Sequence, residues 1–89
     1  MDDAFGGLHR AIVLDNVDPR QSRRLRISVP ALDDVPAAWA CACVPAGQAD
    51  VPAALPMDLP AIGDIVWVMF EAGDPQRPVW LGVLPGSRA

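Results

Sequence analysis

The residues that could do chemistry in this sequence are few. One histidine, His9, and two cysteines, Cys41 and Cys43, are the side chains that most often bind metals or act in catalysis. Together they offer fewer ligands than a structural zinc site needs. The three serines form no recognisable motif with His9 and an aspartate, and Gly6–Gly7 lacks the following Lys and Ser/Thr of a phosphate loop. We therefore expect no enzyme, no metal site and no cofactor site.

The two cysteines are separated by one residue. On an extended strand, Cys41 and Cys43 would point the same way but lie too far apart for an easy disulfide with each other. They fit a reducing compartment and a place in the core. A redox or metal module built on them is an alternative that thiol counting would test.

The charged residues follow the turns and one strand. Aspartates stand in turn-like segments, where their side chains commonly bond the local backbone, at positions 15, 18, 33, 34 and 74. The sequence has no lysine, and four of its arginines are Arg20, Arg23, Arg24 and Arg26. A net charge of −4 and a pI near 4.5 argue against a partner bound mainly through phosphates. A local basic patch on a solvated strand face stays open.

Five segments have the pattern of short strands. Residues 23–30 alternate cleanly, with Leu25, Ile27 and Val29 on one face, and Pro30 ends the run. The other predicted strands are residues 9–14, 39–45, 63–71 and 78–84. Residues 45–60 are rich in proline, so we expect a long loop rather than a helix.

These strands predict an all-β fold, a small five-stranded antiparallel barrel. The OB-fold is the leading architecture, and an SH3-like barrel competes with it. The length of 89 residues predicts a single domain spanning 1–89, with a core at about 9–84 and short flexible termini. The start of the chain lacks the apolar core of a signal peptide, and no run has the length of a membrane span.

The last two predicted strands are apolar on both faces. Ile65, Trp67 and Met69 alternate with Val66, Val68 and Phe70, and in the final strand Trp80 and Leu84 oppose Val79, Leu81 and Val83. A small barrel has one interior, so either the Pro-rich loop or a terminus covers the second face, or this face is a protein interface. The candidate interface residues are Trp67, Met69, Phe70, Trp80 and Leu84. We expect Trp80→Asp, on the presumed outer face, to disrupt assembly more than folding.

The order of the motifs resembles one family. The chain runs "AIVLDNVDP", "RRLRISVP", "WACACVPAG" and "LPAIGDIVWVMFEAGDPQRPVWLG". This resembles the OB-fold domain of phage baseplate spike proteins, the baseplate assembly protein V family, and the related VgrG spike proteins of type VI secretion. The closing pattern of the family is present at Pro60, Gly63, Asp64, Val66, Val68, Phe70, Glu71, Gly73, Asp74, Pro78, Val79, Leu81 and Gly82.

The resemblance implies a structural function. Such domains form a trimeric collar at the centre of a contractile tail baseplate and link the hub and tail tube to the spike tip. It implies a homotrimer in the virion, made in the host cytoplasm, that touches the envelope only during injection and has no stable membrane association. Because the chain stops at "PGSRA", we expect a separate tip protein below it.

Two points qualify the resemblance. The family often has Gly before the Arg of the second strand, where this chain has Ser22–Arg23, so the turn there is expected to differ. OB-folds also commonly bind single-stranded nucleic acid through a basic groove with aromatic platforms, which is the alternative function. The acidic balance, the absence of Tyr and the presence of only two Phe disfavour it, and we expect no nucleic-acid partner.

Overall fold

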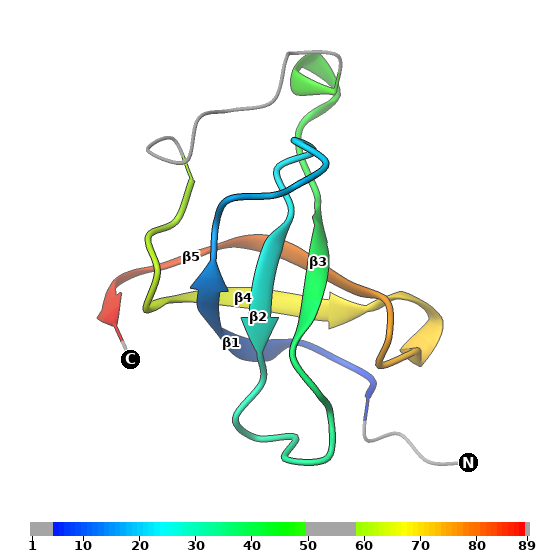
Figure 1. The fold of residues 1–89 in the computed structure, drawn as a ribbon. Helices are drawn as coiled ribbons and strands as arrows, with labels where there is room; N and C mark the ends of the chain where they lie inside the picture. Colours follow the sequence, from blue (N-terminus) through cyan, green and yellow to red (C-terminus); the bar gives the residue numbers. More distant parts are fainter. Residues whose placement is uncertain (1–4, 50–58, 89) are drawn as a thin grey trace.

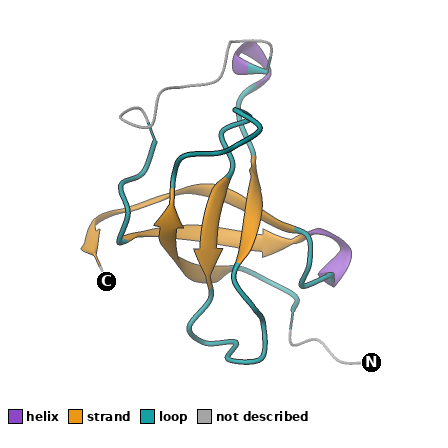
Figure 2. Ribbon diagram, in the orientation of Figure 1, coloured by secondary structure: helices purple, strands orange, loops and turns teal. Residues whose placement is uncertain are grey.

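A computed structural model of the chain describes residues 5–49 and 59–88. Its elements, in order, are strands β1 (His9–Asp15), β2 (Leu25–Ser28) and β3 (Ala38–Ala42), the 3-10 helix η1 (Ala46–Gln48), strand β4 (Asp64–Phe70), the 3-10 turn η3 (Glu71–Gly73) and strand β5 (Pro78–Arg88). The strands form one closed barrel in the order β1-β2-β3-β5-β4 (Figures 1 and 2). This confirms the five-stranded barrel.

The sequence pattern predicted a purely antiparallel barrel, but the barrel contains one parallel pair of strands. Four neighbouring pairs are antiparallel, but β3 and β5 run parallel, with Cys41 opposite Val79 and Ala42 opposite Trp80. The reason is geometric: a closed ring with an odd number of strands cannot alternate direction all the way round. One parallel pair must therefore close a five-stranded barrel.

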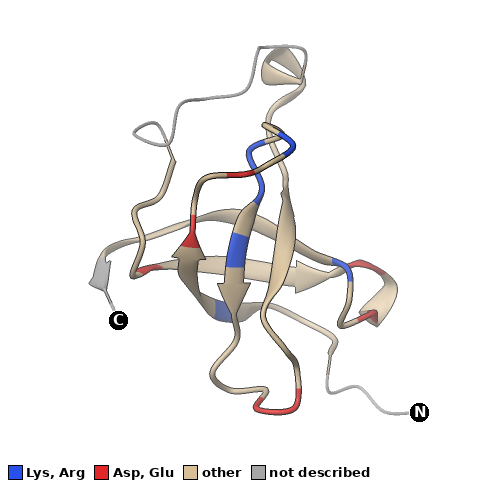
Figure 3. Cartoon of the chain, viewed as in Figure 1, with Lys and Arg blue, Asp and Glu red and all other residues tan. Residues whose placement is uncertain are grey.

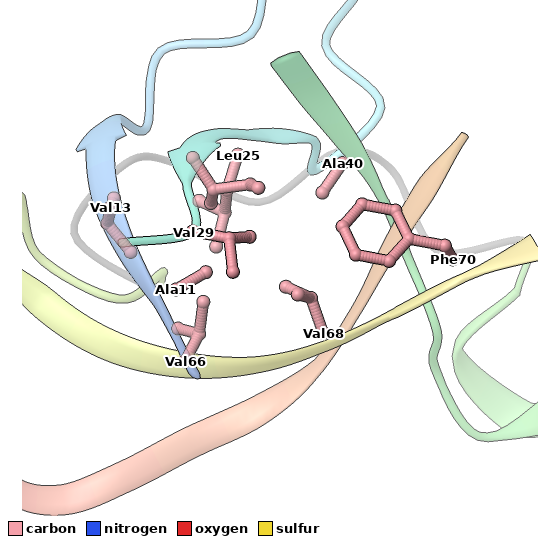
Figure 4. Close-up of a cluster of buried hydrophobic side chains, with 9 residues drawn as sticks. Ala11, Val13, Leu25, Val29, Ala40, Val66, Val68 and Phe70 are labelled. Atoms are coloured by element: carbon pink, nitrogen blue, oxygen red, sulfur yellow. The ribbon is translucent and has the colours of Figure 1, made fainter. Parts of the chain in front are cut away.

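One face of each strand fills the interior. On β2, Leu25 and Ile27 are buried as the alternation predicted, and Val29 follows them. On β4 the inward residues are Val66 and Val68, both fully buried. Figure 4 shows these side chains converging from β1, β2, β3 and β4 on a common centre. Within the described residues, the buried hydrophobic cluster is Ala11, Val13, Leu25, Ile27, Val29, Ala40, Val66, Val68 and Phe70.

Phe70 belongs to this interior. Its side chain is only 6% exposed, and its ring makes an edge-to-face contact with Phe5 at 6.0 Å and a tilted contact with His9 at 5.4 Å. The expectation that Phe70 lies on an exposed interface is therefore corrected. It shares its strand face with Val66 and Val68, so it points into the barrel with them.

Trp80 also points inward. It lies opposite Val68 in the β4–β5 register and packs against the core while remaining half-buried. Its indole Nε1–H donates a hydrogen bond to the carbonyl oxygen of Arg23, at 3.0 Å. Because the outer-face assignment of Trp80 is wrong, the predicted effect of Trp80→Asp must be revised.

The loop between β1 and β2 (residues 16–24) is organised by Asp18. This carboxylate is 7% exposed and accepts hydrogen bonds from the backbone N–H groups of Arg20, Ser22 and Arg24. The guanidinium of Arg24 adds an ion pair, with Nη2 at 2.7 Å from Oδ1. The Arg24 contact, with help from the backbone donors, outweighs burial and holds the pKa of Asp18 far below its usual range. The prediction that Asp18 bonds the local backbone is confirmed.

Two residues of this loop adopt a left-handed backbone. Gln21 has φ of 53° and Arg23 has φ of 62°, a region that favours glycine. Ser22 stands where the resembled family often has Gly, and it has no positive φ, whereas its neighbours Gln21 and Arg23 do. The left-handed positions of this loop are thus occupied by a glutamine and an arginine rather than by glycine.

We expect Arg23→Gly to raise the stability of the domain slightly. Relief of the left-handed strain is worth about 1 kcal/mol, and the added freedom of Gly in the unfolded chain offsets about half of it. The bond from Trp80 survives because it uses the backbone carbonyl of Arg23. Urea unfolding would measure the change, with Ser22→Gly as a control at a neighbouring position that has no positive φ. A loss above about 1 kcal/mol for Arg23→Gly would show that the arginine side chain outweighs the strain.

The Pro-rich connection is described only at its two ends. Residues 46–48 form η1, and residues 59–63 lead into β4, with Pro60 buried. The Asn16 side chain donates to the carbonyl oxygen of Pro60 at 3.0 Å, which ties this segment to the end of β1. The expectation that the loop covers a second apolar face falls largely on residues 50–58, outside the described residues.

Candidate interface on the outer face of the barrel

The outer face of β4 remains apolar although the opposite face already fills the core. Ile65 and Trp67 are half-buried, and Met69 is 43% exposed. A polar residue at these positions would cost the barrel interior nothing, since side chains alternate strictly between the two faces of a strand. An apolar outer face is therefore a feature that barrel folding alone does not explain.

Trp67 is held in place from the neighbouring strand. Arg10 is its register partner on β1, and the Arg10 guanidinium lies over the indole, 5.3 Å from the ring centroid. This distance is typical of a cation–π contact. On the other side, the register partner of Trp67 is Gly82, which has no side chain to cover the ring. The indole is thus fixed by one neighbour and left accessible by the other.

Strand β5 extends the apolar outer face. Val79 is the register partner of Met69, and Leu81 is 40% exposed. The register shifts between Trp67 and Val68, which leaves Leu81 without a partner on β4. Such a bulge interrupts the simple alternation of faces along β5.

A shallow groove of about 410 Å³ continues this surface onto β1. It lies between the residues that follow β2 and the start of β4. Its lining is almost entirely apolar, with Leu8 52% exposed at one end. The lining residues are Leu8, His9, Arg10, Ala11, Ile12, Pro30, Ala31 and Ile65.

The structure divides the five residues predicted for an interface. Trp67 and Met69 lie on the outer face, whereas Phe70 is in the core and Trp80 packs against it. Leu84 is half-buried on the part of β5 beyond its pairing with β3. Sequence reasoning missed the contact of Arg10 with Trp67, which pairs residues of two strands that are distant in sequence. It also left out the outer-face residues Ile12, Ile65 and Leu81.

The cysteines are not in the core. Cys41 and Cys43 are free and exposed, because Ala40 is the β3 residue that points into the barrel. Their expected core role is therefore wrong. His9 places Nε2 at 3.1 Å from the carbonyl oxygen of Gly6 and packs on Phe70, which are structural contacts. Among residues 5–49 and 59–88, no group of three or more His, Cys, Asp or Glu is arranged to hold a metal ion.

In the same ranges, no helix has the length and apolar character needed to cross a membrane.

The strand order and the parallel closing pair define this chain as an OB-fold domain. Residues 9–84 match the family described as the type VI secretion system/phage-baseplate injector OB domain, and the chain belongs to this family. The family is a structural one of baseplate spike proteins, so the resemblance drawn from the motifs is confirmed. A comparison with curated proteins found no match.

Proposed function

We propose that this domain is the OB-fold collar of the central spike in a contractile tail baseplate, where it joins the hub and tail tube to a separate spike-tip protein. Membership of the injector family supports a structural role in a phage or type VI baseplate. The proposed task is mechanical: the collar transmits the thrust of sheath contraction from the tube to the tip. In a phage, the domain would reside in the tail baseplate of the virion.

We further propose that the collar is a homotrimer. The observation that carries this step is the outer face of β4 and β5, where Met69 and Leu81 remain 43% and 40% exposed. Contiguous exposed apolar surface usually marks a protein interface. Trp67 adds an aromatic anchor of the kind that dominates binding energy, and Arg10 already fixes its ring. Because Arg10 already holds the Trp67 ring in place, this side chain loses less conformational entropy on binding.

Met69→Glu is expected to convert the trimer to a monomer without loss of folding. The glutamate would place an unpaired charge in the centre of the apolar contact, which costs more than several weak contacts supply. Light scattering over a concentration series would measure the mass of wild type and variant. The matched control is Val17→Glu, because Val17 is 59% exposed in the β1–β2 loop, away from this face.

A wild-type protein that stays monomeric at all concentrations would contradict self-association through this face. An unchanged trimer for Met69→Glu would place the contact elsewhere on the barrel. In both cases, mixing with the purified hub protein would test the position of the collar independently of trimerisation.

A further inference from the structure

The positive charge of this acidic chain is concentrated in one place. Of its seven basic residues, four lie within residues 20–26, in a protein with a net charge of −4. Figure 3 shows blue segments along the β1–β2 loop and on β2, whereas the loop between β2 and β3 at the opposite end carries red. A gradient of this kind within a small domain orients charged partners.

Only part of this charge is neutralised within the described residues. Asp18 pairs with Arg24, and its remaining bonds go to backbone N–H groups. Arg20 and Arg26 are exposed, and neither forms an ion pair in the part of the chain that the structure describes. Arg26 lies between its register partners Trp39 on β3 and Asp15 on β1, and Arg24 lies over the Trp39 ring at 5.2 Å.

The loop that presents Arg20 and leads into β2 is held at several points and contains strained residues. Asp18 fixes it from within, and the indole of Trp80 fixes it from the barrel through the carbonyl of Arg23. Gln21 and Arg23 adopt left-handed backbone conformations that cost free energy for residues other than glycine. Strain of this kind is characteristic of segments that hold a binding geometry in advance.

A polar pocket opens next to the same loop. It has a volume of about 370 Å³ and lies between the β1–β2 loop and the chain that runs from β3 into η1. Residues 21–23 form one wall, and Ala42, Val44, Gln48 and Ala49 form the other. The amides of Gln21 and Gln48 and the hydroxyl of Ser22 can all donate hydrogen bonds. A pocket with several donors, lined by Arg23 and formed by a loop that also carries Arg20, suits a carboxylate.

We propose that this end of the barrel, made of Arg20, Arg26 and the polar pocket, binds an acidic peptide segment of a partner protein. The proposal does not depend on the trimer, because Arg20 and Arg26 lie on the β1–β2 loop and β2, whereas Met69 lies on β4. A protein segment fits better than a nucleic acid for two reasons. The chain is acidic overall, and the aromatic platform, Trp39, is already covered by Arg24.

The test is a fluorescence-anisotropy titration with a short labelled Glu/Gly peptide, at low and at physiological ionic strength. The same peptide with Gln in place of Glu and an oligothymidylate of equal length are the comparison probes. The double variant Arg20→Gln/Arg26→Gln is expected to weaken binding of the acidic peptide about tenfold. Arg77→Gln is the matched control, since Arg77 is exposed at the other end of the barrel and pairs there with Glu71.

Saturable binding that needs Glu, weakens with salt and is lost in the double variant would support the proposal. It would be overturned by equal binding of the Gln peptide, by an unchanged affinity in the double variant, or by no binding at low salt. Tighter binding of oligothymidylate would also overturn it and would assign the site to nucleic acid. Unfolding midpoints of all variants, measured alongside, separate loss of binding from loss of folding.

Discussion

Trp80→Asp is expected to leave the domain unfolded rather than folded and unassembled. The indole packs against the core beside Val68 and donates its N–H to Arg23. Removing a large aromatic side chain from such a position costs about 3–5 kcal/mol, and an unpaired carboxylate facing the interior adds to this. A domain of this size has about 5–10 kcal/mol of stability in total, so the variant loses most or all of it. Circular dichroism and urea unfolding would measure the loss.

Two further variants make this result specific. Trp80→Phe keeps the aromatic packing and loses only the hydrogen bond, so it should fold with a loss of about 1 kcal/mol. Trp67→Asp changes the neighbouring indole on the outer face and should fold with a near wild-type midpoint while losing the proposed trimer. If Trp80→Asp kept a cooperative transition at the wild-type midpoint, the inward placement of Trp80 would be wrong.

Asp18→Asn is expected to cost about 3 kcal/mol at neutral pH. The Asp18 side chain is 3% exposed and that of Arg24 is 15% exposed, so the variant leaves a largely buried guanidinium without its counter-charge. Breaking a buried pair from one side costs about 3–5 kcal/mol, and the retained amide oxygen of Asn places the expected loss at the lower end. The β1–β2 loop would also lose part of the backbone bonding that holds Gln21 in its left-handed conformation.

This loss should depend on pH in a defined direction. The folded pKa of Asp18 lies well below its usual value, because the Arg24 guanidinium and the backbone donors favour the charged form. The contribution of Asp18 to stability is therefore complete above the unfolded pKa of about 4 and disappears as the pH falls below it toward the folded pKa. The pKa of Arg24 is raised by the same contact, so Arg24 stays charged throughout.

Urea unfolding of wild type and Asp18→Asn at several pH values would check this. The difference between the two proteins should be largest above about pH 5 and should shrink on acidification, because protonated Asp18 resembles Asn. Asp74→Asn is the matched control: Asp74 Oδ1 accepts a hydrogen bond from the backbone of Gln76 in an exposed turn. Its replacement should cost about 1 kcal/mol or less. An equal loss at all pH values would show that the charge of Asp18 is not what stabilises the loop.

The outer face and the arginine-rich end give the barrel two separate surfaces. Met69 and Trp67 lie on β4, whereas Arg20 and Arg26 lie on the β1–β2 loop and β2. The two proposals can therefore fail independently: mass measurements test the first surface, and peptide binding tests the second. The proposed collar would contact both its own copies and other proteins, and two chemically different surfaces would allow both at once.

The sequence by itself determined the strands, the turns and the family. The alternation of Leu25, Ile27 and Val29 marked the buried face of β2, because the other face carries Arg24, Arg26 and Ser28. The turn chemistry of Asp18 was readable because Asp bonds nearby backbone groups whatever the fold around it. The spaced pattern from Pro60 to Gly82 indicated the family, and the family match over residues 9–84 confirms it.

Only the tertiary structure decided which face of β4 is inside. Both faces are apolar, so local periodicity contains no polar residue to mark the exposed side, and the choice depends on the strands that close the barrel. The bulge at Leu81 puts both Trp80 and Val83 in register with inward residues of β4, Val68 and Val66, which strict alternation along β5 does not reveal. The exposure of Cys41 and the burial of the Asp18–Arg24 pair were likewise set by packing between distant segments. These features depend on register and closure, which are properties of the assembled sheet rather than of any one segment.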